Sequence, residues 1–421
     1  MRVATRALLA LAAALVASAT LAAAGTGAST QALTPTPYMG WDTYFAFGSH
    51  YDEATVLEQA SNVITSGMQK AGYRLIWLDV GWWQSGLRGS GGQIVVNPQH
   101  WPHGMAWFVR TLHGMGFKVG LYSDAGINGC GGINQGMYGH YQQDINTFAA
   151  WGFDAVKVDF CGGDDLHLNP KTAYTQIHQA ILHDTPRRPM LLNVCVFPEP
   201  GQVHGYPPFG ASSFASWSFA PAIANSWRTD TDVGSPAGVP WYAVARNMLA
   251  DATNKKAAGP GHWNDPDYLG PNLGLSDREF QTQFSMWAML AAPLMVSANL
   301  STVSQASFAT ILNKQMIAID QDPLGQQGVQ LQPAKVSTAP VDPAGEVWIK
   351  PLVGGAYAVA LLNLDGSTTL SISTTTQAIG MQKAASYKLA NVWAGGTTQT
   401  SGLISATVQP HQTVVYIVTP A

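Results

Sequence analysis

An aspartate ends an apolar stretch near the middle of the chain, in the sequence WGFDAVKVDFCGG at positions 151–163. Residues 153–158 are mostly apolar and lie between glycines, which is typical of a strand covered on both faces in a parallel sheet. Lys157 points to the same side of such a strand as Asp159, so its cation would favour the ionised carboxylate. We therefore predict that Asp159 is a catalytic nucleophile. The alternative is a buried Lys157–Asp159 pair that only fixes the strand register.

The rest of the chain supplies the elements that must position this strand. Strand-like and helix-like segments alternate about every 30 to 40 residues, which is the pattern of βα units in a parallel sheet. One helix-like stretch, 52–72, has Asp52 to cap its start and Gly72 to end it. Eight such repeats predict an α/β fold, a (β/α)8 TIM barrel. The candidate strands are residues 37–44, 73–80, 118–125, 153–160, 190–197, 225–233, 261–269 and 292–300.

Aspartates recur at one end of these predicted strands. Because the carboxyl ends of the strands meet at the rim where barrel enzymes keep their active sites, we expect these side chains to converge. Charged residues make up only 11% of the chain, against roughly 25% in an average protein, so much of its acidic inventory lies at this rim. The aspartates are Asp42, Asp79, Asp124, Asp159, Asp232 and Asp267.

The composition favours a carbohydrate partner and argues against nucleic acid. The net charge is -4 and no basic run occurs, so neither nucleic acid nor an anionic membrane is expected as a partner. The 14 Trp and 43 Gly predict flat aromatic surfaces and many loops, which suit sugars. The sequence carries no signal for the oligomeric state.

The first 24 residues have the features of a secretory signal peptide. Arg2 and Arg6 precede an apolar run that ends in small residues near Ala24, which favours cleavage over the alternative of a membrane anchor. Residues 25–33 are expected to form a flexible leader. We therefore expect a mature protein that is secreted and extracellular and has no membrane contact after cleavage.

The pattern of the sequence changes after about Asp320. The turn-rich run QDPLGQQG at 321–328 is followed by alternating apolar and polar segments separated by Gly, Asp and Ser, namely residues 346–352, 356–364, 368–374 and 412–418. We expect a catalytic barrel over 34–325 and a C-terminal antiparallel β-sandwich over 326–421. The sandwich carries no catalytic-looking cluster, and His411 and Asp365 are expected in turns or on the surface.

Three cysteines fit an oxidising compartment with one disulfide and one spare thiol. Cys130 and Cys161 both follow strand-like segments and would lie at the same end of a parallel sheet, so we predict that they form the disulfide. Cys195 lies within an apolar strand and is expected to be a buried core thiol.

Several motifs in order resemble glycoside hydrolase family 27, the α-galactosidase family. They are PYMGWDTYFAFG, WLDVGWW, GLYSDAG with GCGG, KVDFC, SWRTDTD, GHWNDPD and IDQDPLGQQG, and the resemblance covers roughly residues 35 to 420. It implies a retaining, metal-free hydrolase without a cofactor, and also the Cys130–Cys161 disulfide.

The motifs imply a role for each catalytic position. Asp159 matches the family nucleophile in K-x-D-x-C, and Asp232 matches the acid/base in R-x-x-x-D, with Arg228 as its arginine. Asp230 is the alternative acid/base, disfavoured by its spacing from Arg228. Retaining carboxylate pairs lie about 5 to 5.5 Å apart.

Sugar contacts are implied in the same way. Asp79, Lys157, Arg228 and Asp267 resemble the family residues that bind hydroxyl groups. Tyr122 resembles an aromatic near the anomeric carbon, with a core tyrosine as the alternative. Trp82 and Trp83 follow Asp79 on a predicted exposed loop, and we expect them to form a wall of the sugar pocket rather than core.

Three positions depart from the family pattern. Tyr44 replaces a tryptophan, Val80 replaces the second of two adjacent aspartates, and Val196 replaces a carboxylate after the fifth strand. An apolar Val80 near the C5 substituent would suit a sugar that lacks a free 6-hydroxyl.

The most favoured function is hydrolysis of terminal α-D-galactosyl residues. The alternatives with the same mechanism are a β-L-arabinopyranosidase and an isomaltodextranase-type enzyme. A non-hydrolytic carbohydrate-binding protein is disfavoured by the intact catalytic set. A metal-dependent hydrolase using His262, Asp265 and Asp267 is disfavoured because their spacing fits no known ligand pattern.

Overall fold

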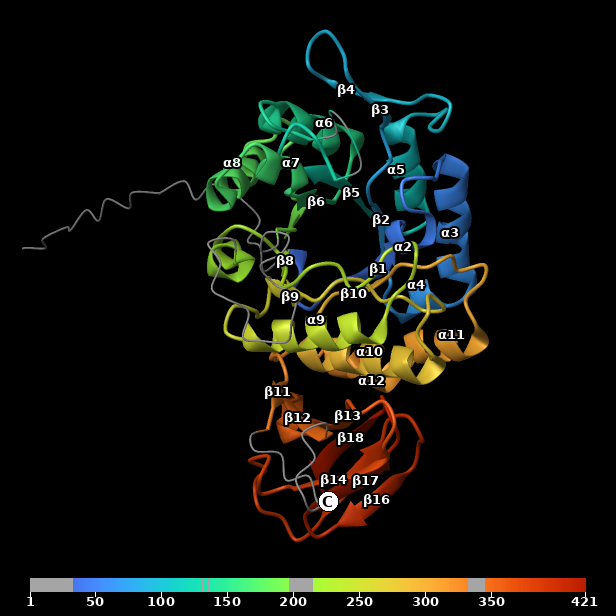
Figure 1. Ribbon diagram of the computed structural model, residues 1–421, viewed down its shortest axis with the longest axis vertical. Helices are drawn as coiled ribbons and strands as arrows, with labels where there is room; N and C mark the ends of the chain where they lie inside the picture. Colours follow the sequence, from blue (N-terminus) through green and yellow to red (C-terminus); the bar gives the residue numbers. More distant parts are fainter. Residues whose placement is uncertain (1–32, 131, 133, 135, 197–214, 332–344) are drawn as a thin grey trace, which may run out of the picture.

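The protein is described by a computed structural model that covers residues 33–130, 132, 134, 136–196, 215–331 and 345–421. It consists of a large α/β part followed by a β-sandwich (Figure 1). The predicted signal peptide, 1–24, and nearly all of the expected leader, 25–33, lie outside the described residues. Within the described ranges, no helix is both long and apolar enough to cross a membrane.

Eight strands form one sheet in the order β10-β1-β2-β5-β6-β7-β8-β9, and each neighbouring pair is parallel. Leu269, just after β9, pairs with Val296 of β10, which closes the sheet into a barrel. Every strand lies inside one of the eight predicted segments, so the (β/α)8 prediction is confirmed. The strands are β1 (Met39–Asp42), β2 (Leu75–Leu78), β5 (Lys118–Asp124), β6 (Ala155–Asp159), β7 (Leu191–Val194), β8 (Ser226–Arg228), β9 (Trp263–Asp265) and β10 (Leu294–Val296).

Helices surround the barrel, and local sequence signals fix several of their ends. Asp52 caps α3 by accepting a hydrogen bond from the Thr55 amide, as predicted. Gly67, at a positive φ of 88°, divides the expected helix into α3 and α4. The helices are α2 (Tyr44–Phe47), α3 (Glu53–Thr65), α4 (Met68–Ala71), α5 (Met105–Gly114), α6 (Tyr141–Trp151), α7 (Cys161–Asp165), α8 (Pro170–Leu182), α9 (Trp241–Thr253), α10 (Asp277–Leu290), α11 (Gln305–Ile311) and α12 (Lys314–Asp320).

A short hairpin is inserted between β2 and α5. Its strands are β3 (Gln84–Arg88) and β4 (Ile94–Val96), and it projects from the edge of the barrel (Figure 1). Arg88 lies at the turn end of β3 and ties this end of the hairpin to α6 through a two-point ion pair with Asp144, at 2.9 and 2.6 Å. The hairpin is therefore anchored next to the rim that carries the predicted site.

The C-terminal part is an antiparallel sandwich, as predicted. The six-stranded sheet has the order β11-β12-β13-β18-β15-β16, and β14 and β17 pair in a second layer. The predicted segments correspond to β12, β13, β14 and β18, whereas β11, β15, β16 and β17 were not predicted. The strands are β11 (Val329–Gln330), β12 (Gly345–Pro351), β13 (Tyr357–Asn363), β14 (Leu370–Thr375), β15 (Tyr387–Asn391), β16 (Thr397–Thr400), β17 (Leu403–Val408) and β18 (Thr413–Pro420).

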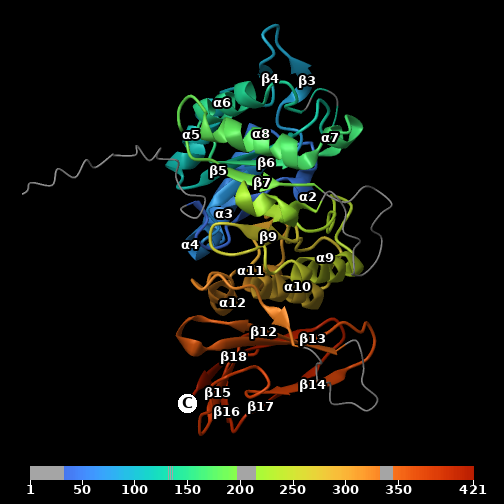
Figure 2. The same ribbon diagram turned by 90° about the vertical axis from the view of Figure 1, so that its left-hand side faces the viewer.

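The central strand β13 of the six-stranded sheet is buried on both faces. Side chains alternate along β13, so that Val359 faces the sandwich core while Ala358 and Ala360 belong to the barrel core. The sandwich packs beneath α10 and α12 in both views (Figures 1 and 2). Lys350 of β12 is buried there and donates to the Ala288 carbonyl of α10 at 2.8 Å. The two parts therefore share one continuous apolar interface.

His411 lies in a turn, as predicted, but it also contacts the barrel. Its ring stacks on Trp241 with ring centroids 4.3 Å apart, and its Nδ1 atom lies 2.7 Å from the Glu279 carboxylate. Asp365 is the expected turn residue, because its carboxylate accepts the amides of Ser367 and Thr368.

Candidate active site

The structure brings the predicted aspartates to one rim of the barrel. Asp42, Asp124 and Asp159 are the last residues of β1, β5 and β6. Asp79 directly follows β2, and the other two lie in the loops after β8 and β9. Parallel strands that end at the same level place these side chains around a common opening, where catalytic groups of barrel enzymes are found. The aspartates predicted at the strand ends therefore form one cluster in the structure.

Lys157 is the buried cation at the centre of this cluster. Its Nζ atom donates to Asp79 Oδ2 at 2.8 Å and lies 4.0 Å from Asp159 Oδ1. It also donates to the Tyr268 hydroxyl at 3.1 Å, and that hydroxyl donates to the same Asp79 oxygen at 2.8 Å. Lys157, Asp79 and Tyr268 thus form a closed hydrogen-bonded triangle, with Asp159 at its edge.

Asp159 is not as strongly ionised as its position beside Lys157 suggested. Burial raises its pKa to about 6, and this effect outweighs the lowering by Lys157. The negative charges of Asp79 and Asp232 raise the pKa further. The predicted cation is present on the correct side of the strand, but its closest carboxylate partner is Asp79. A carboxyl group with this pKa still carries its charge at neutral pH.

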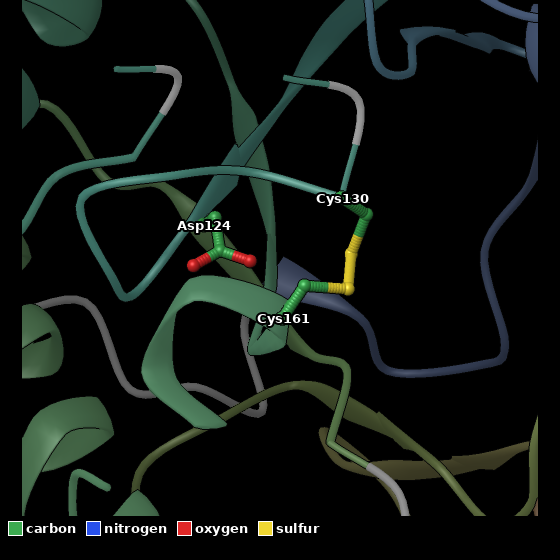
Figure 3. Close-up of side chains that lie close together, drawn as sticks. All are labelled: Asp124, Cys130 and Cys161. Carbon is green, nitrogen blue, oxygen red and sulfur yellow. A yellow bond between two sulfur atoms is a disulfide. The ribbon is translucent and has the colours of Figure 1, made fainter. Parts of the chain in front are cut away.

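A disulfide forms one wall beside Asp159. Cys130 and Cys161 are bonded, with Cα atoms 5.2 Å apart, so the predicted pairing is confirmed (Figure 3). The Cys130 sulfur lies 3.3 Å from Asp159 Oδ2. A disulfide sulfur has no hydrogen to donate, so this contact shields the carboxylate without hydrogen bonding to it. The bridge thereby contributes to the burial that raises the pKa of Asp159.

Asp124 lies beside the same disulfide (Figure 3). Its carboxylate accepts the amides of Gly126 and Gly162 at 2.6 and 3.2 Å, which joins the loop that carries Cys130 to the start of α7, which carries Cys161. Burial raises the pKa of Asp124 to about 7. Its proximity to two sulfurs resembles a metal-ligand set, but both sulfurs are bonded to each other and are not thiolates.

Arg228 organises the opposite side of the opening. Its NH1 atom lies 3.1 Å from Asp232 Oδ1 and 3.0 Å from Asp267 Oδ1. Asp267 is buried, and burial raises its pKa to about 7 despite the opposing charge of Arg228. Asp232 is 45% exposed through its side chain. The arginine therefore joins one buried carboxylate to one that reaches solvent at the mouth of the site.

The side chain of Asp230 has a different environment from that of Asp232. The Asp230 side chain is buried, its Oδ2 atom lies 3.5 Å from Arg246 Nε, and its Oδ1 atom accepts the Thr231 amide. Asp232 is the carboxylate that pairs with Arg228 and whose charge acts on Asp159. The geometry thus favours Asp232 over Asp230 for a role in the opening.

Two tyrosines line the region around Asp159. Tyr44 is half-buried at the start of α2, and burial together with the charges of Asp232, Asp79 and Asp159 raises its pKa to about 12. Tyr122 is buried, its ring lies 5.8 Å from Lys157 Nζ, and its hydroxyl accepts the Cys130 amide. Tyr122, the predicted aromatic, and Tyr44, which replaces a family tryptophan, are therefore both close to the carboxylate cluster.

The prediction for Trp82 is wrong. Its side chain is 0% exposed and packs edge-on against Phe148 and Trp151 of α6, while its Nε1 atom donates to the Tyr122 carbonyl. Trp83 is also buried, so this segment is core and not an exposed loop. The cause is α6, which covers the chain after β2 and cannot be inferred from residues 79–83 alone.

Sequence reasoning missed two polar residues of the cluster. Tyr268 directly follows Asp267, and its position next to the GHWNDPD motif was the available signal. Cys195 is buried as predicted, but it faces the site: its sulfur lies 3.9 Å from Arg228 NH1, and its thiol lowers the pKa of Asp159. Neither a tyrosine nor a cysteine can be assigned to the site from its residue type alone.

The proposed alternative metal ligands do not come together. Within the described residues, the group of potential ligands that lies close enough to hold an ion contains Asp124 and not His262. The His262 ring stacks on Trp227, whereas Asp265 accepts a hydrogen bond from Asn193.

Comparisons with known proteins match both parts of the chain. The family model described as "Alpha galactosidase A" covers residues 37–322, and the one described as "Alpha galactosidase C-terminal beta sandwich domain" covers residues 342–418. Alpha-galactosidase A from Cellvibrio japonicus is 33% identical over 408 residues, which is 92% of this chain and 93% of that protein.

Two solved structures share the fold. The α-galactosidase from Saccharomyces cerevisiae, solved with raffinose, aligns with a TM-score of 0.79 and 24% identity over 93% of this chain and 99% of that chain. A family 27 β-L-arabinopyranosidase from Geobacillus stearothermophilus aligns with a TM-score of 0.77 and 18% identity, over 93% and 98% of the two chains.

Replacing Asp159 by Asn is expected to stabilise the folded protein, and only at high pH. The pKa of Asp159 is raised from 3.8 to about 6 by folding, so its stabilising contribution is complete below pH 3.8 and is lost as the pH rises through 6. Asn avoids this loss, which is on the order of 3 kcal/mol. Urea unfolding at about pH 8 and about pH 4 measures the difference.

Asp232→Asn is the matched control, because its side chain is 45% exposed and its replacement removes no deeply buried charge. Equal stability of wild type and Asp159→Asn at both pH values would contradict the dominance of burial at Asp159.

Proposed function

This chain belongs to the alpha-galactosidase family and is a glycoside hydrolase, and we propose that it removes terminal α-D-galactosyl residues by a retaining, double-displacement mechanism. The observation that carries the mechanism is the pair of carboxylates at different depths, Asp159 with 13% and Asp232 with 45% side-chain exposure. A shielded carboxylate suits attack on carbon, and a solvent-reaching one suits proton exchange with water. Membership of glycoside hydrolase family 27 is part of the proposal and is supported by the fold shared with the arabinopyranosidase.

The reaction proceeds in two steps. Asp159, ionised above its pKa of about 6, attacks the anomeric carbon, and the bond from that carbon to the leaving oxygen breaks. Asp232 gives its proton to the leaving oxygen and becomes a carboxylate. It then takes a proton from a water molecule, which attacks the anomeric carbon and releases Asp159 and the sugar. Two inversions leave the product with the configuration of the substrate.

The cluster around Lys157 is proposed to hold the hydroxyl groups of the sugar. Asp79, Lys157, Arg228 and Asp267 match the family residues for this role, and carboxylate and ammonium groups fix hydroxyls by charge-assisted hydrogen bonds. Tyr268 acts as a positioning residue, because its hydroxyl joins Asp79 to Lys157.

A second candidate activity is hydrolysis of β-L-arabinopyranosides. Val80 supports it: this side chain is 7% exposed and apolar at the position where galactose-specific relatives carry a second aspartate. β-L-Arabinopyranose has the ring stereochemistry of α-galactose without the hydroxymethyl group, so it needs no partner at Val80.

We also propose that the mature protein is secreted. The support is the sequence of residues 1–24, with its two arginines, apolar run and small residues before the cleavage position.

Azide rescue separates the roles of the two carboxylates. Asp159→Ala is expected to lower kcat on an activated α-galactoside on the order of 10⁴-fold or more. Azide then occupies the space of the missing carboxylate and yields the β-galactosyl azide. Asp232→Ala still forms the glycosyl-enzyme from a substrate with a good leaving group, and azide attacks it to yield the α-galactosyl azide. NMR of the isolated azides identifies the anomers.

Asp230→Ala serves as the control, and it should yield neither azide. Hydrolysis retained by Asp159→Ala, or the two anomers exchanged between variants, would overturn the assignment.

Tyr268→Phe is expected to lower kcat/KM for the α-galactoside about 10-fold, mainly through KM. The change removes one donor from Asp79 and one acceptor from Lys157 and keeps the ring, and a lost hydrogen bond to a charged group costs about 1.5 kcal/mol or more. Steady-state kinetics measure it. Tyr73→Phe is the matched control, because its buried hydroxyl bonds the Ile311 carbonyl away from the site. Equal effects of the two variants on KM would show that the Tyr268 hydroxyl does not position Asp79 and Lys157 for substrate binding.

Val80→Asp is expected to raise the ratio of kcat/KM on α-galactoside to that on β-L-arabinopyranoside, by about 10-fold. The new carboxylate can accept a hydrogen bond from the 6-hydroxyl, which only galactose has. Val80→Ala, which removes volume without adding an acceptor, is the control. A ratio that stays the same in a folded Val80→Asp protein would show that Val80 does not set specificity.

A further inference from the structure

A second pocket opens at the opposite end of the barrel from the carboxylate cluster. It has a volume of about 480 Å³ and is lined by residues 33–39 and by the first residues of β2, β5, β6 and β7. We call it the lower pocket. Its size lies within the range of about 300 to 1,000 Å³ that is usual for small-molecule sites. Active sites of barrel enzymes lie at the other end, so the catalytic proposal does not account for this pocket.

The lower pocket is not a passage to Asp159. Between it and the catalytic rim lies a cavity of only about 10 Å³, lined by residues that include Tyr38, Lys157 and Arg228. That volume holds about one water molecule. The Tyr38 hydroxyl closes the space further through hydrogen bonds with Ser226 and Asn193 at 2.9 and 3.2 Å. A molecule in the lower pocket therefore stays separate from the catalytic residues.

Cations outnumber anions at this pocket. Among the residues that the structure describes, Arg74, Lys118 and Arg188 line it together with a single carboxylate, Asp154. Asp154 pairs with Lys118 at 3.1 Å and with Arg188 at 2.7 Å, and its other oxygen accepts from His113 at 2.7 Å. Its two oxygens are thus engaged by these donors, which leaves an excess positive charge even when His113 is neutral. The whole chain is net negative, at -4, so this local excess does not reflect its overall charge.

Arg74 is the cation best placed for an external partner. Its side chain makes no hydrogen bond or ion pair with another residue in the part of the chain that the structure describes, and it is exposed just before β2. The Lys118 side chain is 69% exposed, so its ammonium has free donors as well. Guanidinium and ammonium groups side by side are a common means of binding carboxylates and phosphates.

The interior of the lower pocket is apolar. Met39, Leu75 and Leu191 are each 6% exposed at the strand starts, and Pro35 and Pro37 belong to the wall. A fully hydrated inorganic anion would gain nothing from such a surface, whereas the apolar face of a ring would be removed from water there. The matching ligand therefore combines an anionic group with a ring.

We propose that the lower pocket binds a small ring-bearing organic anion, with the anionic group at Arg74 and Lys118 and the ring against the apolar strand starts. A uronic acid and a sugar phosphate both have this chemistry. The proposal is independent of the catalytic one, because none of the described residues that line the lower pocket belongs to the catalytic cluster.

Calorimetric titration of the full-length mature protein with D-glucuronate, D-glucose 6-phosphate and neutral D-glucose tests the proposal. At least one anion is expected to bind, more weakly as salt is added, while glucose does not. Arg74→Gln combined with Lys118→Gln is expected to weaken anion binding at least about 10-fold. Hydrolysis of the α-galactoside should stay unchanged, which separates a failure here from a failure of the catalytic proposal.

Lys383→Gln combined with Lys388→Gln is the matched control, because it removes two exposed cations from the sandwich. Binding of glucuronate alone identifies a carboxylate ligand, and binding of glucose 6-phosphate alone identifies a phosphate ligand. Absence of binding of both anions at millimolar concentration, equal binding of glucose, or equal losses in the two double variants would overturn the proposal.

Discussion

The active site depends on the buried ammonium group of Lys157, which interacts with both Asp79 and Asp159. Lys157 contacts Asp79 and Tyr268 directly and Asp159 at 4.0 Å, so it offsets the burial of two carboxylates at once. A carboxylate in such surroundings without a cation would take up a proton and lose its nucleophilicity. With Lys157 present, burial still raises the pKa of Asp159, but only to about 6. The nucleophile is therefore poorly solvated and still charged at neutral pH.

The fold positions the residues that determine the pKa of Asp159. β6 places Lys157 and Asp159 on the same side of one strand, and the loops after β2 and β9 deliver Asp79 and Tyr268 from either side. The Cys130–Cys161 disulfide shields the outer face of Asp159. The sandwich packs against α10 on one side of the barrel, so both parts share one apolar interface.

Much of this arrangement could be predicted from the sequence. The alternation of apolar strands and helices indicated eight strands, and aspartates at their ends indicated the rim. Local sequence patterns were insufficient to predict the environment of a residue wherever segments distant in the sequence pack against it. Trp82 looked like a loop aromatic because only the folded position of α6 buries it. The sign of the Asp159 pKa shift was missed for the same reason, since burial depends on the whole barrel. The strands β16 and β17 were missed because Thr, Ser and Gln weaken their apolar alternation.

The central claim is that Asp159 forms a covalent bond with the sugar, and trapping that intermediate tests it most directly. A galactosyl fluoride with a second fluorine at C5 slows hydrolysis of the intermediate while its good leaving group allows formation. After incubation and proteolysis, mass spectrometry is expected to find the sugar on the peptide that contains Asp159, and to find none in Asp159→Ala. Attachment to a different carboxylate, or hydrolysis with an inverted first product and no adduct, would contradict the account.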